Sequence, residues 1–366
     1  SVGEPGEDPP AFIGAALRDA LAGLGRYPKT QGTPVLRQAI ADWLEARYAL
    51  AAGQVDPATQ VQPVNGTREA LFSFVQAVVD PSAGALVAMP NPGYQIYEGA
   101  ALLAGAEPRY LAAGSGPAFQ PDFDSVTPAE WDRCALLFLC NPGNPTGAAL
   151  ALDELTALIE LADRHDFLLA ADECYSEIYD DDEGKPPVGL LEACQRLGRD
   201  DFARCVVFHS LSKRSSVPGL RSGFVAGDAA ALARYRLYRT YHGCAMPPAT
   251  QAASIAAWRD EDHVRRTRDL YRARFDAVLP VLGEVLDVAR PAGSFYLWAG
   301  TPIDDERFCR ELYRRQHVTI LPGSYLSRPT SAGDPGRNRV RLSLVASLED
   351  CVEAAERIRD FCRELA

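Results

Sequence analysis

The chain has 366 residues, of which 47% are hydrophobic and 23% are charged, so it can form two domains around a large buried core. Acidic residues outnumber basic ones by 49 to 37, which gives a formal net charge of −12. This balance argues against nucleic acid or an anionic membrane as a partner, because either would need a basic surface. No run of about eighteen apolar residues occurs, so the sequence predicts no membrane span.

The chain opens with SVGEPGEDPP, which has neither the basic start nor the apolar stretch of a signal peptide. Its nine cysteines include no C-x-x-C pair, and several lie in apolar runs, such as Cys140 and Cys205. A metal site or a disulfide framework is the alternative interpretation of so many cysteines. We expect instead small buried hydrophobic residues in a reduced, cytoplasmic protein without a metal site.

Apolar periodicity predicts helices over 11–24 and 34–50, separated by an exposed loop rich in Gly and Pro. From about residue 60 to 230, short apolar runs alternate with helical patterns such as 152–165. Alternation of strand and helix predicts an α/β fold with a largely parallel sheet. The runs that we predict to be its strands are 85–90, 134–140, 167–172, 205–210 and 222–228.

A long helical stretch over 247–282 follows, and residues 283–366 mix strand-like runs with a terminal helix. Within them, the run 293–298 (GSFYLW) predicts a core strand that is also a pocket wall. The expected fold class is α/β: a large domain with a mostly parallel sheet flanked by helices, and a smaller α+β domain. The acidic loop 180–185 is expected to be a solvated turn. Ligands of such sheets bind beyond the carboxyl ends of the strands, so the polar residues there are the candidates for a site.

Lysine is scarce, because only Lys29, Lys185 and Lys213 occur and nearly all other positive charge is arginine. Lys185 has acidic neighbours and Lys29 lies in the open loop, so both fit a solvated surface charge. Lys213 follows the strand run 205–210 and lies between apolar and small residues. Such surroundings disfavour the charged amine and make it a better nucleophile toward a carbonyl.

Asp172 ends the run 167–172, where a carboxylate is costly unless a positive group meets it. Alone, it would be a helix N-cap or a structural ion pair. Together with Lys213 it predicts pyridoxal 5′-phosphate (PLP) as cofactor, because a buried carboxylate that keeps the pyridine nitrogen protonated makes PLP an electron sink. Tyr175, three residues further on, is placed to donate a hydrogen bond to the cofactor's phenolic oxygen.

Two segments predict a phosphate site. In the first, Gly66, Thr67 and Arg68 stand at a loop-to-helix start, where free N–H groups and the helix dipole favour an anion. A turn with an N-cap and no ligand is the common alternative there. In the second, hydroxyl and arginine side chains flank the lysine, a set that suits a dianionic phosphate. They are Ser210, Ser212 and Arg221.

The segment 141–147 (NPGNPTG) follows the strand run 134–140, and its Asn-Pro pairs and glycines predict a rigid turn. The bond between Asn144 and Pro145 is a candidate cis peptide. As a bare turn the segment would be structural. At the ligand-binding edge of the sheet, however, Asn144 can bond both a cofactor oxygen and a substrate carboxylate.

Four segments resemble, in their order and spacing, the motifs of fold-type I aminotransferases of the aspartate aminotransferase superfamily, and the resemblance covers essentially the whole chain. They are NPGNPTG (141–147), ADECYSEIY (171–179), SLSKRSSVPGLRSGF (210–224) and NRVRLSLV (338–345). The resemblance implies a PLP-dependent transferase fold. It also implies domains at 1–24 (N-terminal part of the small domain), 25–275 (large PLP-binding domain) and 276–366 (small C-terminal domain).

The resemblance implies a role for each matching residue. Lys213 forms a Schiff base with PLP and then moves protons as base and acid, while Asp172 pairs with the ring nitrogen. Tyr175 and Asn144 bond the phenolic oxygen, and Tyr94 stacks on the ring. The residues that hold the phosphate are Gly66, Thr67, Arg68, Ser210, Ser212 and Arg221.

Three further positions imply how substrate and partner are bound. Arg341 clamps the substrate α-carboxylate through two parallel hydrogen bonds. Gly3 belongs to an N-terminal segment that closes over the substrate. Tyr27 reaches the phosphate of the neighbouring subunit, which implies a homodimer with shared active sites.

Other segments resemble the branch of this family that acts on N-succinyl-L,L-diaminopimelate in lysine biosynthesis, with glutamate and 2-oxoglutarate as the amino-group pair. They are NGTREALF (65–72), PNPGYQIYEGAALLAGAEP (90–108) and YRTYHGCAMPPATQAASIAAW (238–258). In two departures, Gly93 stands where an aromatic residue is expected and Ser216 where asparagine is expected. The distal acid of such a substrate needs a second cation. Arg239, His242 and Lys29 are candidates, with an ordinary surface role as the alternative for each.

Two other functions stay open. A carbon–sulfur lyase on the same fold would use the same lysine and aspartate, because the reaction depends on which substrate bond stands perpendicular to the cofactor ring. A PLP-sensing effector domain of a transcription regulator would resemble an aminotransferase after a winged-helix module, and no basic helix-turn-helix precedes SVGEP. The sequence therefore argues against the regulator, but it separates an aminotransferase from the lyase poorly.

Overall fold

A computed structural model describes residues 3–114, 119–180 and 186–365, and the expectation for the acidic loop falls mostly on 181–185, outside these residues. The centre of the fold is a seven-stranded sheet in the order β1-β7-β6-β5-β4-β2-β3. Its strands are β1 (Val61–Val64), β2 (Leu86–Asn91), β3 (Glu107–Ala112), β4 (Cys134–Cys140), β5 (Leu168–Asp172), β6 (Cys205–Ser210) and β7 (Gly223–Gly227). All neighbours are parallel except β7, which is antiparallel to β1 and β6. The predicted mostly parallel sheet is confirmed.

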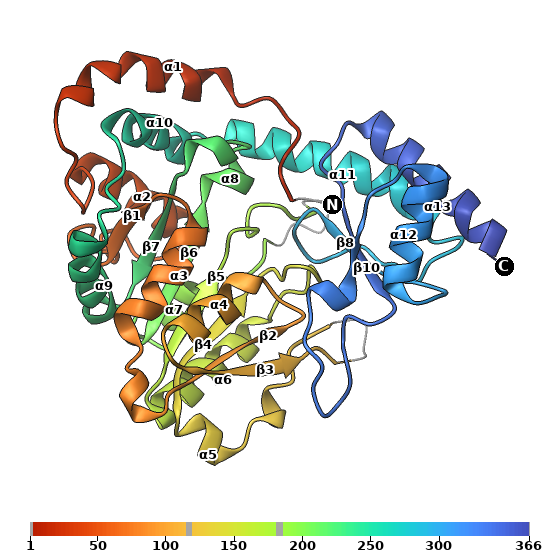
Figure 1. The fold of residues 1–366 in the computed structure, drawn as a ribbon. Helices are drawn as coiled ribbons and strands as arrows, with labels where there is room; N and C mark the ends of the chain where they lie inside the picture. The colour runs from red at the N-terminus through yellow and green to blue at the C-terminus, as the bar shows by residue number, and fades with distance from the viewer. Residues whose placement is uncertain (1–2, 115–118, 181–185, 366) are drawn as a thin grey trace.

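Helices cover both faces of this sheet, because its central strands are apolar on both sides; β6, for example, is buried at every position. One face packs against α2 (Pro34–Arg47), α6 (Leu152–His165), α7 (Leu190–Arg196) and α10 (Pro248–Arg259). The other face packs against α3 (Thr67–Val78), α4 (Gln95–Leu103) and α9 (Ala229–His242). The result is the three-layer arrangement of Figure 1.

Two predicted helices are interrupted. The first, expected over 11–24, ends at Asp19 as α1 (Ala11–Asp19) and continues as the 3-10 turn η1 (Leu21–Gly25). The second, expected over 247–282, is split into α10 and α11 (Asp262–Leu282). The break occurs because Asp260 adopts an extended backbone and its carboxylate accepts the N–H of His263 at 3.0 Å, so it competes with helix continuation.

The remaining short elements connect the larger ones. They are α5 (Pro128–Trp131), α8 (Leu211–Arg214), η2 (Pro81–Ala83), η3 (Phe123–Ser125), η5 (Pro218–Leu220) and η6 (Gly323–Tyr325). All nine cysteines are free and seven are buried, as expected for small hydrophobic side chains. None of the described helices combines the length and the apolar character that crossing a membrane requires.

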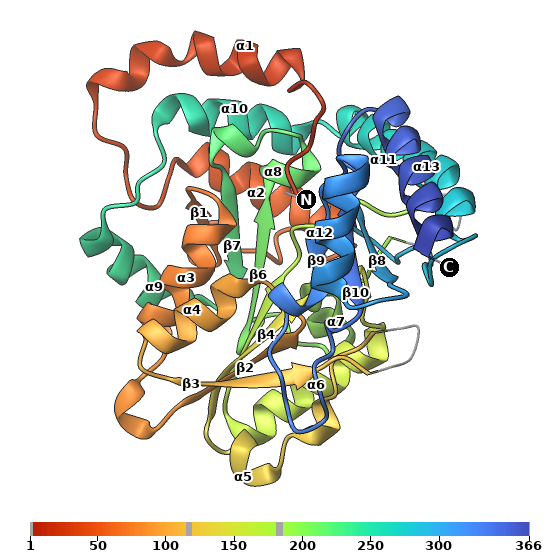
Figure 2. The ribbon, with the colours of Figure 1, turned by 45° about the vertical axis from the view of Figure 1, so that its right-hand side comes forward.

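A smaller α+β unit follows the large sheet, as predicted. Its antiparallel sheet has the order β8-β10-β9, with β8 (Tyr296–Gly300), β9 (Leu321–Pro322) and β10 (Arg339–Ser343). The unit also contains α12 (Asp305–Gln316) and α13 (Leu348–Leu365). Its hydrophobic core joins these elements to the second half of α11, which contributes Tyr271, Phe275 and Val278. Figures 1 and 2 show α11 running from the large unit into this smaller one.

The N-terminal segment divides between the two units. Residues 3–7 reach the small unit: the N–H of Gly6 donates to the carbonyl of Val345 at 3.0 Å, and Glu7 pairs with Arg274 of α11. Helix α1 instead packs against α10, and its Ile13 lies in the core of the large unit. The predicted domain boundaries, at 1–24, 25–275 and 276–366, stay predictions.

Candidate active site

A cavity of about 630 Å³ lies beyond the carboxyl ends of β5 and β6, beside β10 of the small sheet. Other walls come from the first residues of α3 and α4 and from the 141–147 turn. The predicted site residues that line the cavity are Gly3, Thr67, Arg68, Tyr94, Asn144, Asp172, Tyr175, Ser210, Ser212, Lys213, Arg221 and Arg341. The structure thus brings together all the predicted residues except Gly66, which lies directly behind the cavity wall, and Tyr27.

Lys213 lies on α8, a single helical turn that begins where β6 ends at Ser210. Its Nζ donates a hydrogen bond to the carbonyl oxygen of Gly3 and lies 5.5 Å from the centre of the Phe295 ring. Burial lowers the pKa of this amine to about 8, because desolvation disfavours the charged form. A neutral, nucleophilic amine is therefore accessible close to neutral pH.

Asp172 ends β5 and is 4% exposed. Its carboxylate accepts hydrogen bonds from the Tyr97 hydroxyl at 2.8 Å and from the backbone N–H of Cys174 at 3.3 Å. Desolvation raises the pKa of this carboxyl, and among the described residues no lysine or arginine forms an ion pair with it. The sequence analysis missed Tyr97. Its spacing of three residues from Tyr94 puts both side chains on one side of α4, but the sequence does not show that this side faces Asp172.

The opposite wall carries two tyrosines and a guanidinium. The hydroxyls of Tyr175 and Tyr296 lie 3.0 Å apart, and Tyr296 comes from the predicted pocket-wall run 293–298. Arg341 is 8% exposed, donates from Nη1 to Oδ1 of Asn144 at 2.9 Å and lies over the Tyr296 ring at 4.3 Å. The Asn144–Pro145 bond is cis, as expected. Arg341 and Asn144 are therefore held side by side at the cavity.

A cluster of donors faces the third side of the cavity. Gly66 has φ 90° just before α3, and a Cβ atom at this position would collide with the guanidinium of Arg221. Arg68 donates from Nε to the Tyr94 hydroxyl at 2.7 Å. The first N–H groups of α3 have no partner within their helix and point toward the same region. These donors suit a dianionic phosphate.

The residues present therefore fit PLP in two independent respects. The donors around α3 and Arg221 match its phosphate, and the buried Asp172 matches a protonated ring nitrogen. Lys213 supplies an amine of lowered pKa on the same cavity. The fold and this site together define a PLP-dependent enzyme.

Two expectations about more distant residues have different outcomes. Arg239 is completely buried and donates to both carboxylate oxygens of Glu69, at 2.8 and 3.1 Å, so its interpretation as a cation for the substrate's distal acid is wrong. Tyr27 is fully exposed and lies outside the cavity. Because its expected contact is with a neighbouring subunit, its role stays a prediction. Lys29 and His242 are exposed.

Glu69 also belongs to a group of potential metal ligands. Its carboxylate, a ring nitrogen of His242 and the thiol sulfur of Cys244 lie within 4.8 Å of one another. The guanidinium of Arg239 already neutralises Glu69, and its positive charge opposes a dication at the same place.

The two departures from the family pattern have local explanations. A Cβ atom at Gly93 would collide with the carbonyl oxygen of Pro90, so an aromatic residue would require a different backbone there. Ser216 is buried with φ 51°, a left-handed conformation that asparagine adopts more readily than serine. Its hydroxyl has no hydrogen-bond partner among the residues that the structure describes.

Comparison with known proteins agrees with this fold and with a PLP-dependent enzyme. A sequence model of the family described as aminotransferase class I and II matches residues 1–358, so the chain belongs to this family. LL-diaminopimelate aminotransferase from Dehalococcoides mccartyi is 31% identical over 99% of this chain and 90% of its own. The relationship makes the chain a PLP-dependent aminotransferase that acts on amino acids and 2-oxo acids.

Two solved structures place the chain among its relatives. An aminotransferase from Neisseria meningitidis superposes with a TM-score of 0.94 at 48% identity, covering 98% of this chain and 91% of that one. A probable N-succinyldiaminopimelate aminotransferase from Thermus thermophilus superposes with a TM-score of 0.87 at 27% identity, covering 98% and 93%. Both similarities extend over the whole fold.

Proposed function

We propose that Lys213 binds PLP covalently through its amine and that Asp172 pairs with the cofactor's ring nitrogen. The observation that carries this proposal is the presence, on one cavity, of an amine whose pKa is lowered to about 8 and a buried carboxyl whose pKa is raised. Once bound, PLP supplies an electron sink for the substrate's α-carbon. Asp172 keeps the positive charge that this chemistry needs.

The remaining cavity residues orient the cofactor. Tyr175 and Asn144 donate hydrogen bonds to its phenolic oxygen, and Tyr94 lies against the ring. The phosphate is held by Gly66, Thr67, Arg68, Ser210, Ser212 and Arg221. Because Gly66 approaches the Arg221 guanidinium so closely, a larger residue there would displace one of the phosphate donors.

Lys213 also moves the reacting proton. With the cofactor bound, its Nζ would take the proton from the substrate's α-carbon and return it on the other side of the substrate nitrogen, a 1,3-shift that an amine with a pKa of about 8 can serve in both directions. Arg341 binds the substrate α-carboxylate, with Asn144 fixing the guanidinium plane. Gly3 brings the N-terminal segment across the cavity, where a Cβ atom would collide with the Tyr296 hydroxyl.

We further propose an acidic or N-acylated amino acid as substrate, namely N-succinyl-L,L-diaminopimelate, with glutamate and 2-oxoglutarate as the amino-group pair. The support is the resemblance of three segments to that branch and the names of two relatives, one for LL-diaminopimelate and one for its N-succinyl derivative. The cavity of about 630 Å³ has room for a long substrate beside the cofactor.

The proposed assembly is a homodimer with shared active sites. Its support is the exposure of Tyr27 together with large apolar neighbours in the same segment, Leu21 and Leu24. A monomer would leave these side chains in water, whereas a second copy would bury them. Analytical ultracentrifugation of the wild type and of Tyr27→Glu tests this assembly.

A half-reaction tests the proposed function. Glutamate added to the holoenzyme should convert the cofactor to its amino form and release 2-oxoglutarate, whereas a carbon–sulfur lyase would release pyruvate and ammonia from a sulfur-containing amino acid. Lys213→Ala should abolish turnover and the covalent attachment. Retained turnover in this variant would reject the assignment. A comparison of N-succinyl-L,L-diaminopimelate with LL-diaminopimelate then decides the substrate by kcat/KM.

A further inference from the structure

Lys213 and Arg214 are consecutive residues of α8 that point to different parts of the molecule. Lys213 lines the cavity, whereas Arg214 is 2% exposed. The guanidinium of Arg214 lies beside a pair of packed indole rings, 5.5 Å from the centre of Trp43 and 5.0 Å from that of Trp258. A helix of only four residues has almost no internal hydrogen bonds, so its side-chain contacts decide where it lies.

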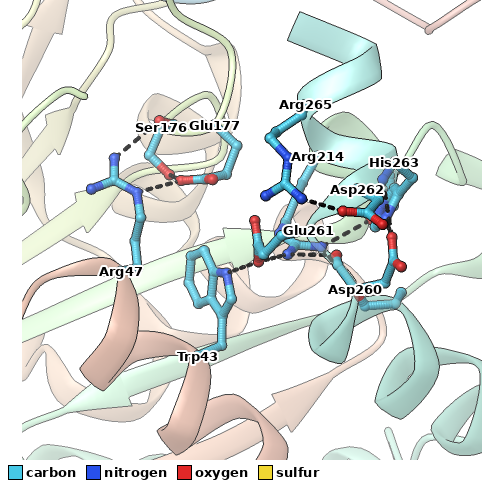
Figure 3. Close-up of polar contacts among 12 residues, drawn as sticks. Trp43, Arg47, Ser176, Glu177, Arg214, Asp260, Glu261, Asp262, His263 and Arg265 are labelled. Atoms are coloured by element: carbon cyan, nitrogen blue, oxygen red, sulfur yellow. Dashed lines mark hydrogen bonds and ion pairs between the residues drawn. The ribbon is translucent and has the colours of Figure 1, made fainter. Parts of the chain in front are cut away.

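Arg214 connects α8 to the junction between α10 and α11. It donates from Nη1 to the carbonyl of Ala257 at 2.8 Å and from Nη2 to that of Asp260 at 3.3 Å, and it forms an ion pair with Glu261. The same Glu261 oxygen accepts the indole N–H of Trp43 at 3.1 Å. Figure 3 shows Arg214 surrounded by these groups.

The next residue adds a second connection to the same junction. The hydroxyl of Ser215 lies 2.8 Å from Nε2 of His263, whose Nδ1 lies 2.6 Å from the carboxylate of Asp260. Both residues that follow the lysine are therefore attached to the segment 257–263. Nothing in this set touches the cavity.

Helix α11 extends this connection to the small unit. It begins at Asp262, and its second half is part of the core that also contains β10, the strand that carries Arg341. Figures 1 and 2 show its course between the two units. Lys213 and Arg341, which come from different units, are thus both connected to α11, the first through α8 and the second through β10.

We propose that Arg214 is a positioning residue: it fixes the α8 turn to the start of α11 and so couples the place of the Lys213 amine to the unit that carries Arg341. The proposal rests on the proposed role of Lys213. Arg214 acts through its neighbour and touches neither cofactor nor substrate. A merely structural Arg214 would affect stability alone, so the readouts must report on the amine itself.

The test uses the holoenzymes of Arg214→Lys, Glu261→Gln and the double variant. Lysine keeps the positive charge but cannot reach Ala257, Asp260 and Glu261 together. We expect kcat of Arg214→Lys to fall by roughly tenfold to a hundredfold, the scale for a misplaced catalytic group, with KM within about twofold. The pH midpoint of the bound cofactor's visible absorbance should shift by about half a unit or more.

Glu261→Gln should change both readouts in the same direction by a smaller amount. The double variant should show the same kcat and the same spectral midpoint as Arg214→Lys alone, because both substitutions remove the ion pair between Arg214 and Glu261. As a control for lost stability, Ile159→Ala in α6 removes a fully buried side chain away from this junction. It should lower the melting temperature and leave kcat and the spectral midpoint unchanged.

Two results would overturn the inference, and they are distinguishable. If Arg214→Lys and Glu261→Gln lower the melting temperature but leave kcat and the spectral midpoint at wild-type values, Arg214 is only structural. If mass spectrometry of the borohydride-reduced holoenzyme finds the cofactor on a lysine other than Lys213, the proposed function itself fails and the inference fails with it.

Discussion

Two buried carboxylates have opposite surroundings: Asp172, which ends β5, and Glu177, five residues later. Each is 4% exposed. Glu177 pairs with Arg47 at 2.6 Å and with Arg268 at 3.7 Å, and these charges outweigh its desolvation, so the pKa of Glu177 is lowered. Among the residues that the structure describes, Asp172 accepts hydrogen bonds from neutral groups alone, and desolvation raises its pKa.

The difference distinguishes a carboxylate that stabilises the fold, Glu177, from one that faces the candidate active site, Asp172. A buried carboxylate with arginine partners is complete within the protein, and Figure 3 shows Glu177 with Arg47. A buried carboxylate without such a partner costs free energy until a ligand supplies the positive charge. This difference supports the proposed pairing of Asp172 with the cofactor's ring nitrogen and gives Glu177, five residues later, a structural role.

The largest expected effect comes from removing the charge of Glu177. Glu177→Gln leaves the buried guanidinium of Arg47 without its carboxylate, so the free energy of unfolding should fall by about 3–5 kcal/mol. Because the folded pKa of Glu177 is lowered, its contribution is present above its unfolded pKa of 4.5 and is lost as the pH falls through the lower folded value. Urea unfolding of the variant and the wild type measures both.

The same variant gives a check on function. Its kcat, corrected for the folded fraction at 25 °C, should equal that of the wild type, because Glu177 does not line the cavity. A loss of kcat larger than the loss of folded protein would show that the two carboxylates are not separable.

The second effect concerns the site. Asp172→Asn should still bind PLP but should lower kcat by roughly a hundredfold to a thousandfold, the scale for removing one preorganised electrostatic partner of the transition state. Stopped-flow spectroscopy of the glutamate half-reaction measures this rate. An unchanged rate would contradict the pairing of Asp172 with the ring nitrogen.

In the cofactor-free enzyme, Asp172→Asn should not lower stability, whereas Glu177→Gln should. The folded pKa of Asp172 is raised, so its charge destabilises the fold above the unfolded pKa of 3.8 and fully so above the folded pKa. Asp172→Asn removes this cost, and the cofactor-free variant should melt no lower than the wild type at pH 7. Glu177→Gln should melt at a lower temperature than the wild type, so the two substitutions should have different effects on the melting temperature.

Much of this site was predictable from the sequence because its chemistry is local. A charged residue that ends an apolar run, as at Asp172, or that follows one in a small-residue loop, as at Lys213, is unusual enough to be recognised without a structure. The carboxyl ends of neighbouring parallel strands meet at one edge, so the topology brought these residues together.

What could not be predicted depends on contacts between distant segments. Tyr97 is one of several tyrosines in the sequence, and only the packing of α4 against β4 turns it toward Asp172. Arg239 has the positive charge that a distal acid of the substrate requires, yet the position of α9 beside α3 pairs it with Glu69. The break at Asp260 likewise depends on a capping bond that periodicity does not show.

A third, smaller effect tests whether the site recognises carboxylates by geometry or by charge alone. Arg341→Lys keeps the charge but loses the paired donors and the contact with Asn144. The transition-state stabilisation for glutamate, calculated from kcat/KM, should therefore fall by about 1.5–3 kcal/mol. Steady-state kinetics measure this loss. Retained kcat/KM would move the carboxylate clamp to another residue.

The smallest effect falls on Ser216, in the short loop between α8 and η5. Ser216 has a left-handed backbone, which costs about 1–2 kcal/mol for a residue other than glycine, and a buried hydroxyl without a partner among the described residues. Ser216→Gly relieves both at an entropic cost of about 0.4–1 kcal/mol, so the enzyme should gain about 1 kcal/mol of stability. The neighbouring Ser215→Ala removes the bond to His263 and should lose stability by a similar amount.

The pair also distinguishes what holds the loop. If α8 is fixed by its connection to the start of α11, Ser216→Gly should leave kcat unchanged although it loosens the backbone three residues after Lys213. Ser215→Ala, which weakens that connection, should lower kcat along with stability. Equal kcat losses in both variants would mean that the stiffness of the loop, and not its attachment to α11, places the amine.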